Sequence, residues 1–125
     1  MAGAGVVHIP WYATFFRGDA IETALEEVGP IALRYGASDF QIERSREDRY
    51  RFLHSVAFED KVDFERFWHG PEMIDFRVRY SGHFVVPIVY EWWERVSSGA
   101  IPTEATTAAE PAVVPADGGN GSNGG

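Results

Sequence analysis

The sequence predicts an α+β fold of the ferredoxin-like kind, in which a four-stranded antiparallel sheet carries two helices on one face. Two observations lead to this prediction. Segments with an apolar residue at every second position alternate with segments in which apolar residues recur every three or four positions. Between residues 6 and 97 these segments follow the order strand, helix, strand, strand, helix, strand, which is the split βαββαβ arrangement. The 125 residues show no internal repeat and are enough for one domain with one core.

The first predicted strand, residues 6–16, is largely apolar or aromatic on both of its alternating faces. One face carries Val7, Ile9, Trp11, Ala13 and Phe15, and the other carries His8, Pro10, Tyr12, Thr14 and Phe16. A strand with this pattern is covered on both sides. Because the two helices can cover only one side of the sheet, we expect a second copy of the chain to cover the other. The pattern therefore predicts a homodimer in which two sheets pack face to face.

The first helix is predicted to begin at Asp19, a good N-cap residue with Glu22 at the capping-box position. Its apolar stripe recurs at helical spacing and consists of Ile21, Leu25, Val28, Ala32 and Tyr35. Pro30 falls inside this pattern and should kink or split the helix. Gly36 is placed to end it in the left-handed conformation.

The second helix follows a strand directly, in a stretch whose apolar period changes near residue 60. A more polar strand at residues 40–45 and a charged turn at residues 46–48 precede this stretch. The apolar face of the strand carries Tyr50, Phe52, His54, Val56 and Phe58, and the apolar stripe of the helix carries Val62, Phe64, Phe67 and Trp68. With Asp60 as its N-cap, the helix should pack over the strand face that holds His54.

The second helix is interrupted, and the last strand contains a proline. Gly70 and Pro71 allow a new helical segment to begin, which Gly82 should end. The fourth strand is predicted over residues 85–96. Pro87 cannot donate a ladder hydrogen bond, so this strand should lie at an edge of the sheet or carry a bulge.

The two ends of the chain have compositions that cannot form a core. Residues 1–5 are predicted to be a loose end, and residues 98–125, an acidic tail rich in Gly and Pro, to be disordered. The net charge of −8 argues against a nucleic-acid partner. The chain has no cysteine, no leader-like start and no apolar run near the roughly 20 residues that span a membrane. We therefore expect a cytoplasmic protein without a membrane partner.

The order of elements, the stretch YRFLHSVAFEDKVDFERFWHGPEM and the closing VPIVYEWWERV resemble the dimeric α+β barrel superfamily. The likeness is strongest to the antibiotic-biosynthesis-monooxygenase (ABM)-like domain and covers residues 6–96. It implies a dimeric α+β barrel and an oxidoreductase that uses no cofactor, in which a phenolic, quinol or polycyclic aromatic substrate is deprotonated and reacts with oxygen directly. The superfamily also contains proteins of other function. The alternative is a non-catalytic barrel that binds a small apolar ligand or acts as a stress or regulatory protein.

The resemblance assigns roles to particular residues. His54 and Trp68 match a His on the third strand and a Trp on the second helix of some members, which implies a general base and a stacking partner for the substrate. Phe64 and Ile74 stand where some members carry Asn and Tyr. No His lies ten residues after Phe67 or Trp68, so haem degradation is not expected. The proposed substrate-binding residues are His8, Phe52, Phe64, Tyr80 and His83.

Each of these residues also has a plain structural interpretation. His54 can be a core histidine hydrogen-bonded to the backbone, and Trp68 can be a core residue. His8 can face either the pocket or the dimer partner. The four histidines lack the spacing of a zinc site, so no metal is expected. An enzyme would need a second polar side chain, from Arg77, Tyr80 or His83, beside His54 in one cavity.

Overall fold

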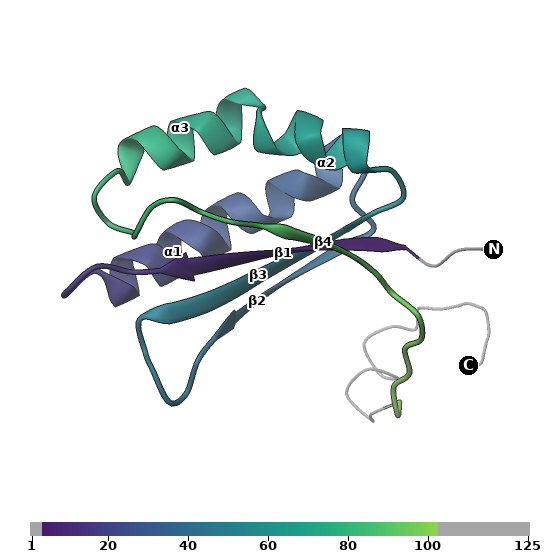
Figure 1. Cartoon of the computed structure of the whole chain (residues 1–125), viewed down its shortest axis with the longest axis horizontal. Coiled ribbons are helices and arrows are strands. Elements are labelled where there is room, and N and C mark those ends of the chain that lie inside the picture. The colour runs from purple at the N-terminus through teal and green to yellow at the C-terminus, as the bar shows by residue number, and fades with distance from the viewer. Residues whose placement is uncertain (1–3, 103–125) are drawn as a thin grey trace.

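Four strands form one antiparallel sheet in the computed structural model, which describes residues 4–102 (Figure 1). The strands are β1 (Gly5–Tyr12), β2 (Asp39–Arg44), β3 (Arg51–Phe58) and β4 (Glu91–Glu94), in the sheet order β2-β3-β1-β4. The helices are α1 (Gly18–Val28), the 3-10 helix η1 (Gly29–Tyr35), α2 (Lys61–Trp68) and α3 (Pro71–Arg79). All of them lie on one face of the sheet (Figure 1). The predicted ferredoxin-like α+β fold is confirmed.

Each predicted helix is divided into two pieces where a proline follows a glycine. η1 begins at Gly29 and carries Pro30 in its first turn, and α3 begins at Pro71. Proline is tolerated in a first turn because its missing N–H would have no partner there. Gly36 ends η1 with φ 100°, the left-handed conformation predicted for it. The split at Pro30 and the new segment at Pro71 are therefore both confirmed.

Two local predictions at the start of α1 are wrong. β1 ends at Tyr12 instead of Phe16, because the chain turns where Arg17 N donates to Thr14 O at 2.9 Å. The N-cap of α1 is Arg17, whose side chain makes no capping hydrogen bond. Asp19 lies inside the first turn, where its carboxylate accepts a hydrogen bond at 2.9 Å from Arg44 of β2. The carboxylate that was predicted to cap the helix instead forms an ion pair with Arg44.

The core lies between the helices and the inner face of the sheet. It includes Val7, Ile9, Trp11, Ile21, Leu25, Val56, Phe58, Phe64, Phe67 and Met73, each no more than 1% exposed. The predicted stripe of the first helix is buried except for Tyr35, which is partly buried. Val62 is an exception, because it is 57% exposed and contributes little to the packing of α2. None of the helices within the described residues is long and apolar enough to cross a membrane.

The last strand is much shorter than predicted. β4 contains only residues 91–94, and a segment that we call the strap, residues 85–90, precedes it. Strand pairing occurs at both ends of the strap: His8 of β1 lies opposite Glu91, and Ala13, one residue after β1, lies opposite Phe84. The four residues of β1 between these pairs therefore face the six residues of the strap. The two extra residues make the strap bulge from the ladder. β4 is an edge strand, as predicted for the segment that contains Pro87.

Candidate active site

Six aromatic side chains from both ends of the chain gather between α2, α3 and the sheet. We call them the aromatic cluster; it consists of Trp11, Phe64, Trp68, Phe76, Phe84 and Tyr90. Trp11 lies near its centre, with ring centroids 5.9 Å from Trp68, 5.3 Å from Phe76 and 5.1 Å from Phe84. Trp68 stacks on Phe64 at 5.9 Å. The cluster provides several flat apolar faces of the kind that bind an aromatic ligand.

His54 lies under this cluster, on the inner face of β3, with no exposed surface. Its Nδ1 accepts a hydrogen bond from Trp11 Nε1 at 3.4 Å. Its Nε2 has no hydrogen-bond partner among residues 4–102. Burial disfavours the charged imidazolium and lowers the pKa of His54 to about 4, so the ring is neutral at pH 7.

Arg77 of α3 brings a cation to the cluster. Its guanidinium lies 4.1 Å from the ring centroid of Trp68, and its Nη2 donates to the backbone oxygen of Trp68 at 2.9 Å. Its Nη1 is buried without a partner among the described residues. Burial lowers the pKa of Arg77, and nearby Tyr90 opposes this effect. A guanidinium with a spare donor is suited to an oxygen-bearing ligand.

Tyr80 and His83 lie at the end of α3 and in the following turn. Their rings meet edge to face at 5.5 Å, and Tyr80 contacts Phe76 of the aromatic cluster at 5.4 Å. The Nδ1 atom of His83 is buried and has no partner among residues 4–102. These two residues therefore border the cluster next to Phe76.

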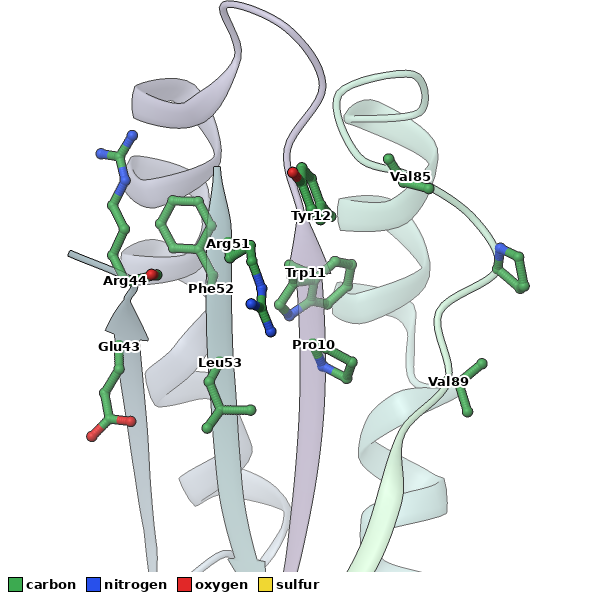
Figure 2. Close-up of a pocket in the computed structure, with 12 residues that line it drawn as sticks. Pro10, Trp11, Tyr12, Glu43, Arg44, Arg51, Phe52, Leu53, Val85 and Val89 are labelled. Carbon is green, nitrogen blue, oxygen red and sulfur yellow. The ribbon is translucent and has the colours of Figure 1, made fainter. Parts of the chain in front are cut away.

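Phe52 occupies a different position from Phe64, although both were predicted to bind substrate. The guanidinium of Arg44 lies 5.0 Å from the centroid of the Phe52 ring. Phe52 also lines a pocket of about 630 Å³ on the face of the sheet away from the helices (Figure 2). Pro10, Leu53 and Val89 surround this pocket, and Trp11 reaches its wall.

His8 is not part of the arrangement around His54. It lies on the outer face of β1, half-buried, where its Nδ1 is 3.0 Å from the hydroxyl of Ser55 and its ring meets Trp93 at 6.2 Å. His8 therefore lies on the sheet face away from the helices and from His54. The structure thus brings His54, Trp68 and Phe64 together, places Tyr80 and His83 at the border, and separates His8.

Of the aromatic cluster, the sequence analysis named only Phe64 and Trp68 as site residues and missed four others, which are Trp11, Phe76, Phe84 and Tyr90. Trp11 shares its strand face with Val7 and Ile9, which marked it as a core residue. Its register partner on β3 is Phe52, which makes His54 its diagonal neighbour. Tyr90 belongs to the strap and contacts Phe64 at 4.9 Å and Trp68 at 5.5 Å. The contacts of Trp11 and Tyr90 depend on how the strands pair. The spacing of apolar residues along the chain does not specify that pairing.

No group of three or more side chains placed to hold a metal ion occurs within the described part of the chain. No protein-family model matches the sequence, and no curated protein matches it. Solved structures do resemble it in fold. A candidate antibiotic biosynthesis monooxygenase from Nitrosomonas europaea superposes with a TM-score of 0.70 at 15% identity, covering 77% of this chain and 93% of that one.

Two further structures carry the same kind of name. A candidate antibiotic biosynthesis monooxygenase from Bordetella bronchiseptica has a TM-score of 0.67 at 18% identity, covering 76% of this chain and 99% of that one. One from Chloroflexus aurantiacus has a TM-score of 0.65 at 12% identity, covering 80% of this chain and 100% of that one. The resemblance noted in the sequence is thereby confirmed for the fold. The chain has the ferredoxin-like α+β fold of the antibiotic-biosynthesis-monooxygenase-like proteins.

Proposed function

We propose that the protein is a cofactor-independent monooxygenase that acts on a phenolic, quinol or polycyclic aromatic compound. One observation carries the proposal: three buried side-chain nitrogens have no partners among residues 4–102, on His54 and Arg77 against the aromatic cluster and on His83 at its border. Each buried and unsatisfied polar group costs about 1–3 kcal/mol. A flat ring with oxygen substituents would satisfy both features of the site, because the cluster stacks on the ring and the nitrogens meet the oxygens.

The chemistry needs no electron carrier, because the substrate itself is the reductant. For a hydroquinone, one atom of O₂ enters the ring as a hydroxyl group and the other leaves as water. The substrate loses four electrons in this conversion to a hydroxyquinone, and its two surplus hydrogens end in the water. The protein has to bind the ring, hold its oxygens and exclude water. Trp68 would stack on the ring, while His54 and Arg77 would contact its oxygens.

Access to His54 requires a movement, because the residue has no exposed surface. The strap is the segment best suited to provide it. It bulges from the ladder, and its Tyr90 covers Trp68 and Phe64. Displacement of the strap would open the cluster next to the pocket that Trp11 and Val89 line. The same movement would close the site around a bound ligand.

The proposal includes a homodimer formed through the outer face of the sheet. Large side chains are exposed there, including Tyr12, Leu53 and Trp93. Glu43 and Arg51 line the same pocket and carry opposite charges. A two-fold axis brings the same patch of each copy together, so Glu43 of one copy could pair with Arg51 of the other. A second copy therefore fits this face better than a charged partner of one sign.

Oxygen uptake with reduced naphthoquinone tests the function. We expect the protein to raise the rate above the spontaneous oxidation of the same solution. In ¹⁸O₂, one labelled atom should appear in the organic product and the other in water. His54→Ala should reduce kcat by about 10²–10³-fold, which is typical when one stabilising donor is removed. The control is His69→Gln, an exposed residue at the end of α2, which should keep the activity.

The alternative is a barrel that binds an aromatic ligand without catalysis. The closed and mainly apolar surroundings of His54 favour this alternative. A ligand-binding barrel would quench Trp fluorescence when the naphthoquinone binds, without any oxygen uptake above the protein-free rate. This outcome would contradict the monooxygenase.

A further inference from the structure

The hydrogen bond between Trp11 and His54 determines where the imidazole carries its proton. An indole Nε1–H can only donate, so the Nδ1 of His54 must accept through its lone pair. A neutral imidazole has one N–H and one lone pair. With the lone pair of Nδ1 occupied by Trp11, the proton belongs on Nε2.

The surroundings support a neutral ring in this form. His54 is fully buried, and its neighbours across the sheet, Ile9 on β1 and Ile42 on β2, are apolar. No side chain among residues 4–102 accepts a hydrogen bond from Nε2. The result is a buried N–H donor that has no acceptor among the described residues. Such groups are rare in folded proteins and call for an explanation in terms of function.

We propose that Trp11 is a positioning residue that holds His54 as the Nε2–H tautomer, and that His54 donates a hydrogen bond to a substrate oxygen instead of removing a proton. This inference rests on the proposed function and replaces the general-base role that the sequence suggested for His54. A base needs a lone pair directed at the substrate, and here the free nitrogen carries the proton. The phenol proton therefore leaves to solvent, and the substrate binds as a phenolate.

A donor suits every stage of the proposed oxidation. The phenolate oxygen carries a negative charge when the substrate binds and becomes a carbonyl oxygen as electrons pass to O₂. Both are hydrogen-bond acceptors, so the Nε2–H of His54 can remain bonded throughout. A donor fixed before the substrate arrives costs no reorganisation during the reaction, and such groups stabilise developing charge effectively. Trp11 supplies this fixation without touching the substrate oxygen.

Nitrogen-15 NMR of the imidazole rings tests the tautomer without any assay of activity. In the unaltered protein at pH 7, we expect the His54 Nε2 to carry the proton and the Nδ1 to appear as an acceptor. Naphthoquinone, whose carbonyls accept hydrogen bonds, should shift the Nε2–H signal. An Nδ1–H tautomer would overturn the proposal, and so would an Nε2–H signal that saturating naphthoquinone leaves unmoved.

Trp11→Phe keeps a ring but removes the indole donor. We expect the His54 signals to report a mixture of tautomers in this variant, with a larger loss in kcat than in affinity for the reduced naphthoquinone. Retention of a pure Nε2–H form would overturn the role of Trp11. Because the measurement on the unaltered protein needs no substitution, the proposal stays testable even if this core variant fails to fold.

The variant His54→Gln tests whether His54 acts as a hydrogen-bond donor or as a general base. Glutamine offers an oxygen to Trp11 and an N–H to the substrate, but it is not a base. We expect His54→Gln to keep kcat within roughly tenfold of the unaltered protein while His54→Ala loses about 10²–10³-fold. Equal loss in both variants would overturn the donor role. If no variant or parent consumes oxygen, the proposed function fails, whereas the NMR result still decides the tautomer.

Discussion

At the scale of single residues, Trp68 is the contact point of the site. Its ring packs against Phe64 of its own helix, Trp11 of β1 and Tyr90 of the strap. The guanidinium of Arg77 from α3 lies over the same ring. These partners come from four elements, so the position of Trp68 depends on all of them. Aromatic pairs of this kind contribute about 0.5–1.5 kcal/mol each beyond the area that they bury. These contacts fix the orientation of the Trp68 ring.

His54 should make the stability of the protein depend on pH. Its pKa is about 4 in the folded chain and 6.5 in the unfolded one. Between these values the unfolded chain binds a proton that the folded chain excludes, so its contribution to stability is complete above pH 6.5 and is lost as the pH falls towards 4. The loss over this window should be about 3 kcal/mol. Urea unfolding at pH 7 and at pH 4.5 measures it.

The control for this measurement is the imidazole itself. His54→Phe fills the same core position without a titrating group, so its free energy of unfolding should fall less between the two pH values. His69→Gln, on the surface, should behave like the unaltered protein. An equal pH dependence in all three proteins would contradict the assigned pKa.

At the scale of elements, the junction between α2 and α3 depends on Gly70. A Cβ added there would lie 2.6 Å from the hydroxyl of Tyr35 and 2.9 Å from the backbone oxygen of Arg66. The Tyr35 hydroxyl donates to Glu72 at 2.6 Å, which ties η1 to the first turn of α3. The close approach of these three segments keeps α2 and α3 in place behind the aromatic cluster.

Gly70→Ala should therefore destabilise the protein by about 1–3 kcal/mol, as overpacking typically does. The side chain of Tyr35 has to move, while the backbone oxygen of Arg66 cannot. Thermal unfolding measures the effect. The matched control is Gly99→Ala, where an added Cβ has nothing within 4 Å. Equal melting temperatures for the two variants would show that the junction absorbs a methyl group without cost.

Two prolines, Pro10 and Pro87, lie in the interval where the ladder between β1 and the strap is interrupted. The backbones of Tyr12 and Thr14 bond to the last segment, through Val85 N to Tyr12 O and Thr14 N to His83 O. Pro10 lies two residues before Tyr12, so its nitrogen faces the same side and has no hydrogen to donate. Pro87 lacks a donor on the opposite side. The ladder is therefore interrupted here, and a bulge of two residues fills the interval.

At the scale of the whole molecule, the two faces of the sheet differ. The inner face is sealed by helices, whereas the outer face exposes Tyr12 to 47%, Leu53 to 37% and Trp93 to 53%. Aromatic and aliphatic side chains of this size are typical of the centre of a protein interface. The outer face also holds the pocket of about 630 Å³, which a second copy would convert into an enclosed space.

Leu53→Asp should convert the proposed dimer into a monomer, because it places a charge at the centre of the outer face. Ile74→Asp is the matched control. Ile74 is also an exposed aliphatic residue, 45% exposed, but it lies on α3 away from the sheet. Light scattering should give twice the chain mass of 14.0 kDa for the unaltered protein and for Ile74→Asp, and a single chain mass for Leu53→Asp. A monomer for the unaltered protein at micromolar concentration would contradict the interface.

The sequence by itself determined the order of the elements, the inner and outer faces of β1 and β3, and the breaks at Pro30 and Pro71. These features are local: the periods of 2 and 3.6 follow from backbone geometry, and proline acts on its own turn. His54 and Trp68 could be singled out for the same reason, since each lies on the apolar face of its own element. The disorder predicted for the acidic tail concerns residues 98–125, most of which lie outside the described residues.

Only the tertiary structure decided what these residues touch. Trp11 meets His54 across 43 positions because β1 and β3 pair in one register out of several that their periods allow. The carboxylate of Asp19 bonds to Arg44 of β2 instead of capping its own helix, because α1 already begins at Gly18. The bulge of the strap, the position of Tyr90 and the proton on His54 Nε2 all follow from such long-range contacts. Local periodicity contains no information about them, because it specifies which face a side chain occupies and not which side chain it meets there.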